Sequence, residues 1–446
     1  MRRPALPEVL GSLPETSAAL VRAVLEQADA QRIRVYLVGG PVRDLLLGRA
    51  VRDVDLLVEA WEGGGALELA RAVVTPELRA TAHDRFGTVT LRGERAAIDL
   101  ATVRREAYAH DGALPTVEPG SLEEDLRRRD FTVNALALPL SAAARARRAG
   151  IVDVEEGLAD LEQRRLRILH PRSFHDDPTR ALRAARLAPR LGFSVTRDTR
   201  SALWGALRDG AFGRVSGDRL RRELVKLFED AALGLDPARA LRLLGDWHVL
   251  GALEPGLGVE RAAAAPLRRI GRAVMEAPWQ AGRWRPWISG LAVWLATLPP
   301  ALRRRALQRF AVRGEQARRI AEFPKARDAW LRGLARARGR GAIDAVLAGV
   351  DEESLHALHA WAPPALRRRI RRWAGEDRAR RLPVTGSDLV EVGLVGPAVG
   401  RALLCIRTAY LDGALCTREE ALALARELSR GRGARRPRRP KTQPRR

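Results

Sequence analysis

The chain has 446 residues, of which 46% are hydrophobic and 30% charged, a composition that suits a globular protein of about three domains. Its 79 Lys and Arg residues outnumber 54 Asp and Glu residues, and the formal charge of +25 favours a polyanionic partner such as nucleic acid over a surplus that only reflects a GC-rich genome. No apolar run is long enough to span a bilayer, no secretory signal is expected after Met1, and only two cysteines occur, so membrane and disulfide-stabilised secreted classes are excluded and a cytoplasmic protein is expected.

The first 140 residues predict a domain that mixes helices and strands. Residues 16–30 carry apolar side chains at helical spacing and lead into a β-rich run. Short runs of this kind then alternate with helical segments, which is typical of an α/β or α+β domain. The expected strands cover 35–39, 54–58, 87–91 and 96–101. Residues 122–138 and most of 158–230 are expected to be helical.

The rest of the chain predicts an all-helical region. Beyond about residue 235, helices rich in Ala, Leu, Arg and Trp alternate with breaks at Pro and Gly, and the apolar run 288–298 is interpreted as a buried helix. The final segment, 431–446, carries eight basic residues and no large apolar side chain, so we expect it to be disordered and to attract RNA non-specifically. Cys405 and Cys416 lack metal-site spacing and are expected to be buried.

Two carboxylates interrupt the second expected strand. Residues two apart in a strand face the same side, so Asp53 and Asp55 should project into one space. Like charges there repel each other unless a cation joins them, and Mg2+ prefers oxygen ligands that it shares with phosphates. A surface turn with incidental acids is the alternative, but the apolar neighbours Val54 and Leu56 indicate a buried strand. The pattern therefore predicts a magnesium site at Asp53 and Asp55.

A glycine turn precedes this strand. Gly39 and Gly40 separate the first expected strand from a helix, which lets backbone N–H groups approach a phosphate at the helix N-terminus. Arg43 lies in the first turn of that helix and can bind a phosphate through two donors. The turn, the arginine and the two carboxylates together outline a site for nucleotidyl transfer.

The segment LVGGPVRDLLLGRAVRDVDLLV strongly resembles the head of the class II tRNA nucleotidyltransferases and bacterial poly(A) polymerases, in the DNA polymerase beta superfamily. Further similar motifs follow in the order IDLATVRREAY (98–108), SLEEDLRRRDFTVNALAL (121–138), VDVEEGLADLEQRRLRIL (152–169), DDPTRALRAARLAPRLGF (176–193) and TGSDLVEVGLVGPAVGRALL (385–404). The resemblance implies an α+β fold, with a polymerase-beta-like head of a mixed sheet and helices followed by an all-α neck, body and tail. The expected boundaries are 1–155 for the nucleotidyltransferase head, 156–235 for the helical neck with a nucleotide-selecting helix, 236–375 for the body, 376–430 for a tRNA-binding tail and 431–446 for the disordered basic tail.

The neck motif offers a way to select a base. Four arginines fall on one helical face, at positions 180, 183, 186 and 190, with Asp177 one turn before the first. A solvated basic stripe is the plain alternative. A carboxylate beside a guanidinium can instead pair with a base that has an exocyclic amine: Asp177 would accept from the amine of cytosine or adenine and Arg180 would donate to the ring acceptors, whereas uracil and guanine would leave polar groups unpaired. By resemblance, this pair selects CTP and ATP, and Arg183 and Arg186 contact phosphate or support the base site.

The resemblance also implies roles for residues of the head. Arg129 matches a position that contacts the nucleotide, and Asp130 and Asn134 match residues that recognise the ribose 2′-OH. A salt bridge from Asp130 to a neighbouring arginine is the alternative. Asp99 is either a third acid that assists deprotonation of the attacking hydroxyl or a structural carboxylate.

Together these features predict an Mg2+-dependent, template-independent transferase that adds C, C and A from CTP and ATP to the 3′ end of tRNA. Its partners would be tRNA and the two nucleotides, without a membrane or a stable protein partner. A partial CC- or A-adding enzyme and a poly(A) polymerase share these motifs, and a non-catalytic RNA-binding protein is the alternative from another class. The turns at Thr385-Gly386 and Gly396-Pro397 are expected to precede helices whose free N–H groups receive RNA phosphates.

Overall fold

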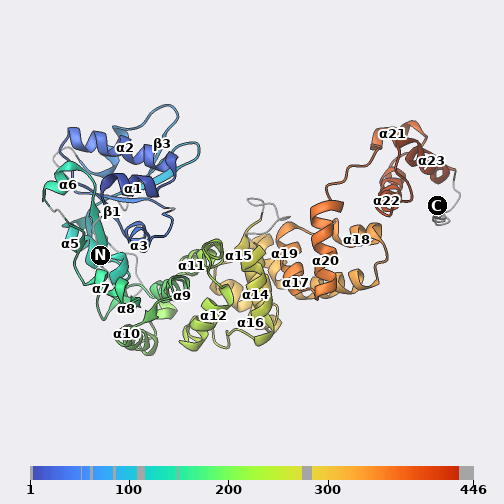
Figure 1. Cartoon of the computed structure of the whole chain (residues 1–446). Helices are drawn as coiled ribbons and strands as arrows, with labels where there is room; N and C mark the ends of the chain where they lie inside the picture. The colour runs from blue at the N-terminus through green and yellow to red at the C-terminus, as the bar shows by residue number, and fades with distance from the viewer. Residues whose placement is uncertain are drawn as a thin grey trace, which may run out of the picture. The chain divides into compact units, whose positions relative to one another are not determined.

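The computed structural model describes residues 4–51, 53–60, 64–83, 87–107, 116–147, 150–273 and 284–430. The chain forms two compact units (Figure 1), one of Met1–Glu223 with Leu243–Pro255 and one of Leu224–Arg242 with Gly256–Arg446. The division into head, neck, body and tail is finer than this and stays a prediction. The expected disorder of residues 431–446 lies outside the described residues.

A seven-stranded mixed sheet forms the base of the first unit. Its strand order is β3-β4-β5-β2-β1-β8-β9, and every neighbouring pair is antiparallel except β2 and β5, which run parallel. The strands are β1 (Val35–Val38), β2 (Asp55–Val58), β3 (Arg79–His83), β4 (Thr88–Arg92), β5 (Ala97–Thr102), β8 (Leu136–Pro139) and β9 (Val152–Asp153). The four strands expected before residue 102 are therefore confirmed to within one residue at either end.

The prediction of a helix over 122–138 is wrong in its second half. α5 (Leu122–Arg127) and a single 3-10 turn, η2 (Thr132–Asn134), are helical, but Leu136–Pro139 form β8. All four residues of β8 are buried, and the strand pairs with β1 inside the sheet. A short apolar run suits a strand that is buried on both faces as well as a helix, and pairing with β1 decided between them.

Helices cover both faces of the sheet. α2 (Glu15–Ala30) confirms the helix expected at 16–30 and packs on β5 and on α4 (Ala66–Arg71). On the other face, Tyr36, Val38 and Leu57 share a core with Leu122 and Leu126 of α5. The remaining helices of this region are α1 (Leu6–Ser12), α3 (Gly40–Leu46), α6 (Ala142–Arg147) and α7 (Gly157–Glu162).

Four further helices follow the sheet within the first unit. They are α8 (Ser173–Asp176), α9 (Thr179–Leu191), α10 (Arg197–Arg208) and most of α11 (Gly217–Glu229), with α13 (Val249–Leu253) returning to this unit later in the chain. α9 buries Ala181, Leu182, Ala184 and Ala185, and ends at Gly192, whose φ of 75° stops the helix in a left-handed conformation. Two short parallel strands, β10 (Arg165–Leu166) and β11 (Ser194–Val195), join the chain before α8 to the chain after α9.

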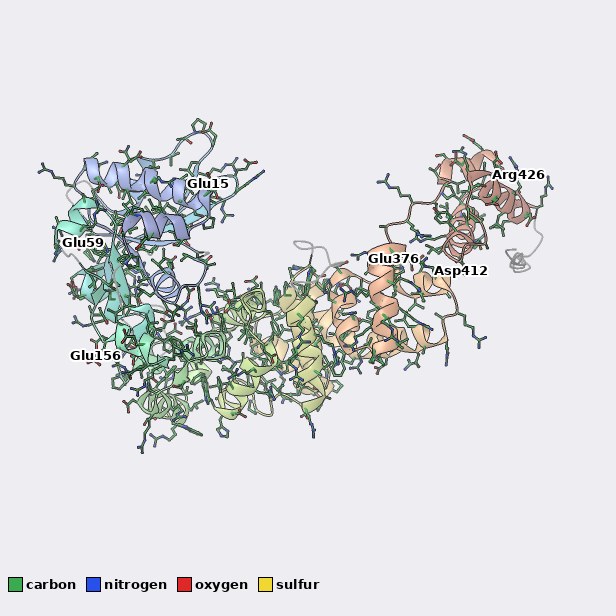
Figure 2. The ribbon with its side chains drawn as sticks, in the orientation of Figure 1. Glu15, Glu59, Glu156, Glu376, Asp412 and Arg426 are labelled. Carbon is green, nitrogen blue, oxygen red and sulfur yellow. The ribbon has the colours of Figure 1, made fainter. Side chains whose placement is uncertain are left out.

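The second unit is helical throughout its described residues, as the sequence predicts. α15 (Pro286–Leu295) is buried from Trp287 onward, which confirms the buried helix. Asp412 follows α22 and accepts a hydrogen bond from the backbone N–H of Gly341 in α18 at 2.9 Å, which ties these two helices together (Figure 2). The other helices are α12 (Pro237–Asp246), α14 (Arg261–Ala273), α16 (Pro300–Arg309), α17 (Gly314–Arg336), α18 (Arg340–Leu347), α19 (Glu352–Trp361), α20 (Pro364–Arg372), α21 (Gly386–Glu391), α22 (Pro397–Leu411) and α23 (Arg418–Ser429).

Two predictions that concern the whole chain have different outcomes. None of the described helices has the length and apolar character needed to cross a membrane. Both cysteines are free and exposed, so the prediction that Cys405 and Cys416 are buried is wrong. The apolar core of the last three helices is filled by Leu, Ile, Val and Ala side chains, and no space among them is assigned to either thiol.

Candidate active site

Two carboxylates lie side by side at the start of β2. Asp55 is the first residue of β2 and pairs in parallel register with Asp99 of β5, so both side chains project from the same face of the sheet. Asp53 lies two residues earlier and is exposed, as Asp99 is, whereas Asp55 is half-buried. Asp99 also accepts a hydrogen bond from Thr90 Oγ1 on the neighbouring strand β4 at 2.5 Å.

The electrostatics of Asp55 indicate that the three carboxylates act on one another. Burial raises the pKa of Asp55 to about 6; the charge of Arg129 opposes this rise, and the charges of Asp99 and Asp53 add to it. A cation among these oxygens would relieve both the repulsion and the desolvation. Within the described part of the chain, no group of three or more His, Cys, Asp or Glu side chains is arranged as a complete metal site. Two carboxylates completed by substrate phosphates are nevertheless a common donor set for Mg2+, so the residues fit this ion.

The glycine turn before α3 has a guanidinium packed against it. Gly39 has φ 75° and ψ −132°, a conformation that favours glycine, and a Cβ atom there would lie 2.9 Å from Arg129 Nη1. A Cβ atom on Gly40 would lie 3.4 Å from Arg43 Nη2. The missing side chains therefore let two arginines approach the turn closely.

Arg129 has an unused donor beside that turn. Its Nη2 donates to Asp125 Oδ1 at 3.2 Å, and Asp125 is fully buried. Its Nε is buried and finds no hydrogen-bond partner among the described residues. A buried N–H without a partner is costly, so this group marks a place where an anion would bind. Its influence on the pKa of Asp55 places its charge near the carboxylates.

Arg43 is fixed inside the protein. It is buried, its Nε donates to Asp44 Oδ1 at 2.8 Å, and its Nη1 donates to Asn134 Oδ1. Asn134 in turn donates from Nδ2 to Asp130 Oδ1 at 2.9 Å. Side-chain hydrogen bonds therefore connect the helix after the glycine turn to Asp130.

Asp130 continues this network to α9. It is buried and accepts from Arg183 Nε on α9 at 2.7 Å. Burial opposes its ionisation, but the charge of Arg183 and the hydrogen bonds from Asn134 and Arg183 outweigh burial and hold the pKa of Asp130 below its usual range. The same contact raises the pKa of Arg183. The salt bridge that the sequence offers as an alternative for Asp130 is present, with Arg183 as its partner.

The arginines of α9 do not form a solvated stripe. Arg180 is buried and donates to Ser173 Oγ at 2.5 Å and to the backbone carbonyl of Arg128 at 2.7 Å. Arg186 is also buried and forms an ion pair with Glu223 of α11. The position of Arg183 near Asp55 follows from its effect on the pKa of that carboxyl.

Asp177 lies just before α9 and keeps one oxygen free of described contacts. Its Oδ1 accepts from Thr179 N at 2.9 Å and from Thr179 Oγ1 at 2.6 Å, and forms an ion pair with Arg219 Nη2 at 2.7 Å. All three contacts involve Oδ1. No hydrogen bond joins the side chains of Asp177 and Arg180; each is held by other residues.

Sequence reasoning missed the residues that hold these side chains. Arg219 and Glu223 lie four apart on α11 and reach Asp177 and Arg186, while Ser173 and Asp125 hold Arg180 and Arg129. The spacing of Arg219 and Glu223 places them on one helical face, a signal that was available. Their partners on α9 are set by how the two helices pack, which spacing does not specify.

The two expected helix starts in the distal motif are confirmed. α21 begins after Thr385 and α22 after Gly396. The Thr385 N–H and Oγ1 are both bonded to Asp388 Oδ2, so a carboxylate of the chain itself occupies this helix end. Gly396 makes no side-chain cap. Phosphate binding at either turn stays a prediction.

Three relatives carry the comparison by sequence. A family model described as the poly A polymerase head domain matches residues 35–167. The A-adding tRNA nucleotidyltransferase of Halalkalibacterium halodurans is 30% identical over 425 residues, which cover 92% of this chain and 92% of that protein. The A-adding enzyme of Geobacter sulfurreducens is 29% identical over 94% of this chain, which spans only 48% of that longer protein. The CC-adding enzyme of Deinococcus radiodurans is 41% identical over 50% of this chain and 55% of its own.

Solved structures agree over most of the chain. A Thermotoga maritima CCA-adding enzyme complexed with tRNA has a TM-score of 0.67 at 26% identity, covering 95% of this chain and 99% of its own. A CCA-adding enzyme has a TM-score of 0.69 at 27% identity both with CTP, covering 97% of this chain and 100% of its own, and with ATP, covering 94% and 96%. A mixed sheet with paired carboxylates, followed by helices, defines the polymerase-beta-like nucleotidyltransferase class. Within it, this chain belongs to the family of tRNA nucleotidyltransferases and poly(A) polymerases.

Proposed function

We propose that the protein is a template-independent RNA nucleotidyltransferase that adds C, C and A from CTP and ATP to the 3′ end of tRNA and releases pyrophosphate. One observation carries the proposal: the Asp55–Asp99 pair lies near the charge of Arg129, whose buried Nε has no described partner. Carboxylates beside an anion-accepting donor suit a nucleoside triphosphate with its metal ion. The complexes of similar enzymes with tRNA, CTP and ATP support the substrates, and such an enzyme is expected in the cytoplasm.

In the proposed reaction, the 3′-oxygen of the RNA attacks the α-phosphorus and pyrophosphate leaves. Asp53 and Asp55 would hold Mg2+, which when bound lowers the pKa of the hydroxyl and stabilises charge on the phosphoryl oxygens. Asp99 is positioned to accept the hydroxyl proton. Arg129 donates from Nε to the triphosphate, and the Gly39 turn lets that triphosphate approach the backbone closely. No covalent intermediate with the protein is required.

Nucleotide choice is assigned to the start of α9. Asp177 Oδ2 is free of described contacts and would accept from the exocyclic amine of cytosine or adenine, while Arg180 would donate to the ring. Asp130 and Asn134 would recognise the ribose, and Arg183 and Arg186 would support the site through their ion pairs. Uracil and guanine would place a carbonyl opposite Asp177 without a proton between the two oxygens, which disfavours both bases.

Addition of A alone is a second candidate function. The relatives from Halalkalibacterium and Geobacter match over nearly the whole chain, and both are named A-adding enzymes. The CC-adding relative is more similar, but over half of this chain only.

Labelled CTP and ATP, offered with three RNAs, would distinguish these functions. The RNAs are a tRNA transcript without its CCA end, one that ends in CC, and an unrelated RNA. A complete CCA-adding enzyme extends both tRNAs, an A-adding enzyme extends only the transcript that ends in CC, and a poly(A) polymerase also extends the unrelated RNA with ATP. Asp53→Ala should abolish incorporation while tRNA binding persists. A wild-type protein that binds RNA but incorporates nothing would be a non-catalytic RNA-binding protein.

A further inference from the structure

One face of α10 carries exposed arginines around an exposed tryptophan. Arg197, Arg200, Trp204 and Arg208 are all exposed, and at 100° per residue they lie within about an 80° arc of the helix. The opposite face buries Thr199, Leu203 and Ala206. The acids nearest in sequence, Asp198 and Asp209, fall outside the arc. We call the four exposed residues the α10 stripe.

The arginines of this stripe are not engaged with the protein. None of Arg197, Arg200 and Arg208 makes a side-chain hydrogen bond or an ion pair with any described residue. Exposed arginines elsewhere often do: Arg318 and Arg319 pair with Glu315, and Arg221 pairs with Asp218. Three unpaired guanidiniums on one helical face therefore leave their charge available to an external anion.

The aromatic ring at the centre of the stripe is also unusual for this chain. Trp204 is 49% exposed, and among the described tryptophans it is the one that is classed as exposed. The exposed His248 ring lies beside it, with ring centroids 5.1 Å apart and planes tilted by 49°. His248 is held there with φ 61° just before α13. One further acid, the exposed Asp246, lies two residues before it.

We propose that the α10 stripe is a docking surface for the RNA substrate, outside the candidate active site. Trp204, supported by His248, stacks on an unpaired base, and the flanking arginines contact the phosphates on either side. A flat aromatic ring among free guanidiniums matches the alternation of base and phosphate in an unstacked RNA segment, because every base offers a π face and every phosphate a charge. A protein partner would not require that combination. The inference rests on the proposed tRNA substrate and adds a second point of contact to it.

Equilibrium binding of a labelled tRNA transcript without its CCA end, to the full-length protein over a series of salt concentrations, tests the stripe. Trp204→Ala should weaken binding about tenfold with little change in salt dependence, and Trp204→Phe should keep most of the affinity. The triple variant Arg197→Gln, Arg200→Gln and Arg208→Gln should reduce the slope of log affinity against log salt by about 2 to 3. All four positions are exposed, so the variants should retain the wild-type thermal unfolding curve.

A matched triple variant provides the control. Arg22, Arg92 and Arg95 are exposed and without described ion pairs, and their replacement by Gln removes the same charge. If this control weakens RNA binding as much as the stripe variant does, or if Trp204→Ala binds RNA like wild type, the proposal is overturned, and a role of the stripe toward a protein partner would replace it.

Nucleotide incorporation on the same preparations separates this inference from the proposed function. The stripe variants should raise the KM for tRNA and keep the wild-type kcat. RNA affinity that depends on the stripe in a protein that incorporates nothing would uphold the surface and refute the enzyme. Normal incorporation with RNA binding that is insensitive to the stripe would do the reverse.

Discussion

Arg183 of α9 is bonded to Asp130, 53 residues earlier in the chain, through Nε and Nη2, both 2.7 Å from Oδ2. Asp130 also accepts from Asn134, which accepts from Arg43 beside the glycine turn. This chain of contacts joins the helix that carries the candidate base-selecting residues to the turn that would receive the triphosphate. A change at either end should therefore affect both stability and nucleotide binding.

Asp130→Asn should destabilise the first unit. The variant leaves Arg183 without its charge partner, and because that arginine is partly exposed we expect a loss of about 2–4 kcal/mol at neutral pH in urea unfolding. The pKa of Asp130 is lower in the folded state than its unfolded value of about 3.9, so the stabilisation is complete well above that pH and is lost as the pH falls toward the folded-state pKa. The difference between wild type and variant should accordingly shrink in acid. Asp218→Asn, which removes an exposed ion pair with Arg221, should cost less than about 1 kcal/mol; an equal cost for both variants would contradict the role of the network.

Asp55→Asn should stabilise the metal-free protein at alkaline pH. Burial raises the pKa of Asp55 to about 6, so its charge costs nothing below its unfolded pKa of about 3.9, and the cost grows as the pH rises through 6. We expect a gain of about 1–2 kcal/mol at pH 8 and almost none at pH 4, measured by thermal unfolding in a chelator. Added Mg2+ should raise the Tm of wild type but not of Asp55→Asn. Equal Mg2+ shifts in both proteins would rule out Asp55 as a ligand.

Gly39→Ala should impair nucleotide binding through Arg129. The new Cβ atom would meet Arg129 Nη1 at 2.9 Å, and the backbone conformation at φ 75° is strained for alanine by about 1–3 kcal/mol. Gly48→Ala is the matched control, because Gly48 has φ 65° and nothing within 4 Å of its Cβ position. Both variants should lose stability, but Gly39→Ala should also raise the KM for CTP and ATP, by about tenfold or more. If the two variants have the same KM, the guanidinium does not depend on the space at Gly39.

Arg180→Lys should loosen the choice among nucleotides. A lysine cannot keep both donor contacts, to Ser173 Oγ and to the carbonyl of Arg128, while it also offers a donor to a base. The ratio of kcat/KM for CTP or ATP to that for UTP or GTP should fall by about 5- to 100-fold. Ser173→Ala keeps the arginine but loosens it, and should change the ratio in the same direction by less. A uniform loss for all four nucleotides would mean that Arg180 is a structural residue only.

Local patterns predicted the first four strands closest to the site because each short apolar run has turn residues on both sides. The same reasoning failed at Leu136–Pro139, where an apolar run without alternation is compatible with two structures and pairing with β1 selected one of them. The exposed cysteines are a similar case, because a side chain of neutral character is buried only where the packing provides space for it.

The amino-acid order alone determined that Asp53 and Asp55 lie two apart at the start of a strand, that Gly39 breaks the chain before a helix, and that the arginines of α9 share a face. These are consequences of chain geometry over a few residues, and they hold in any fold that keeps the strand and the helix. Only the tertiary structure decided that Asp99 lies opposite Asp55, that Arg129 packs on Gly39, and that Arg180 and Arg186 are buried by Ser173 and Glu223. Those contacts join residues from different elements, and they form where burying apolar surface and pairing buried charges are satisfied together, which no local pattern specifies.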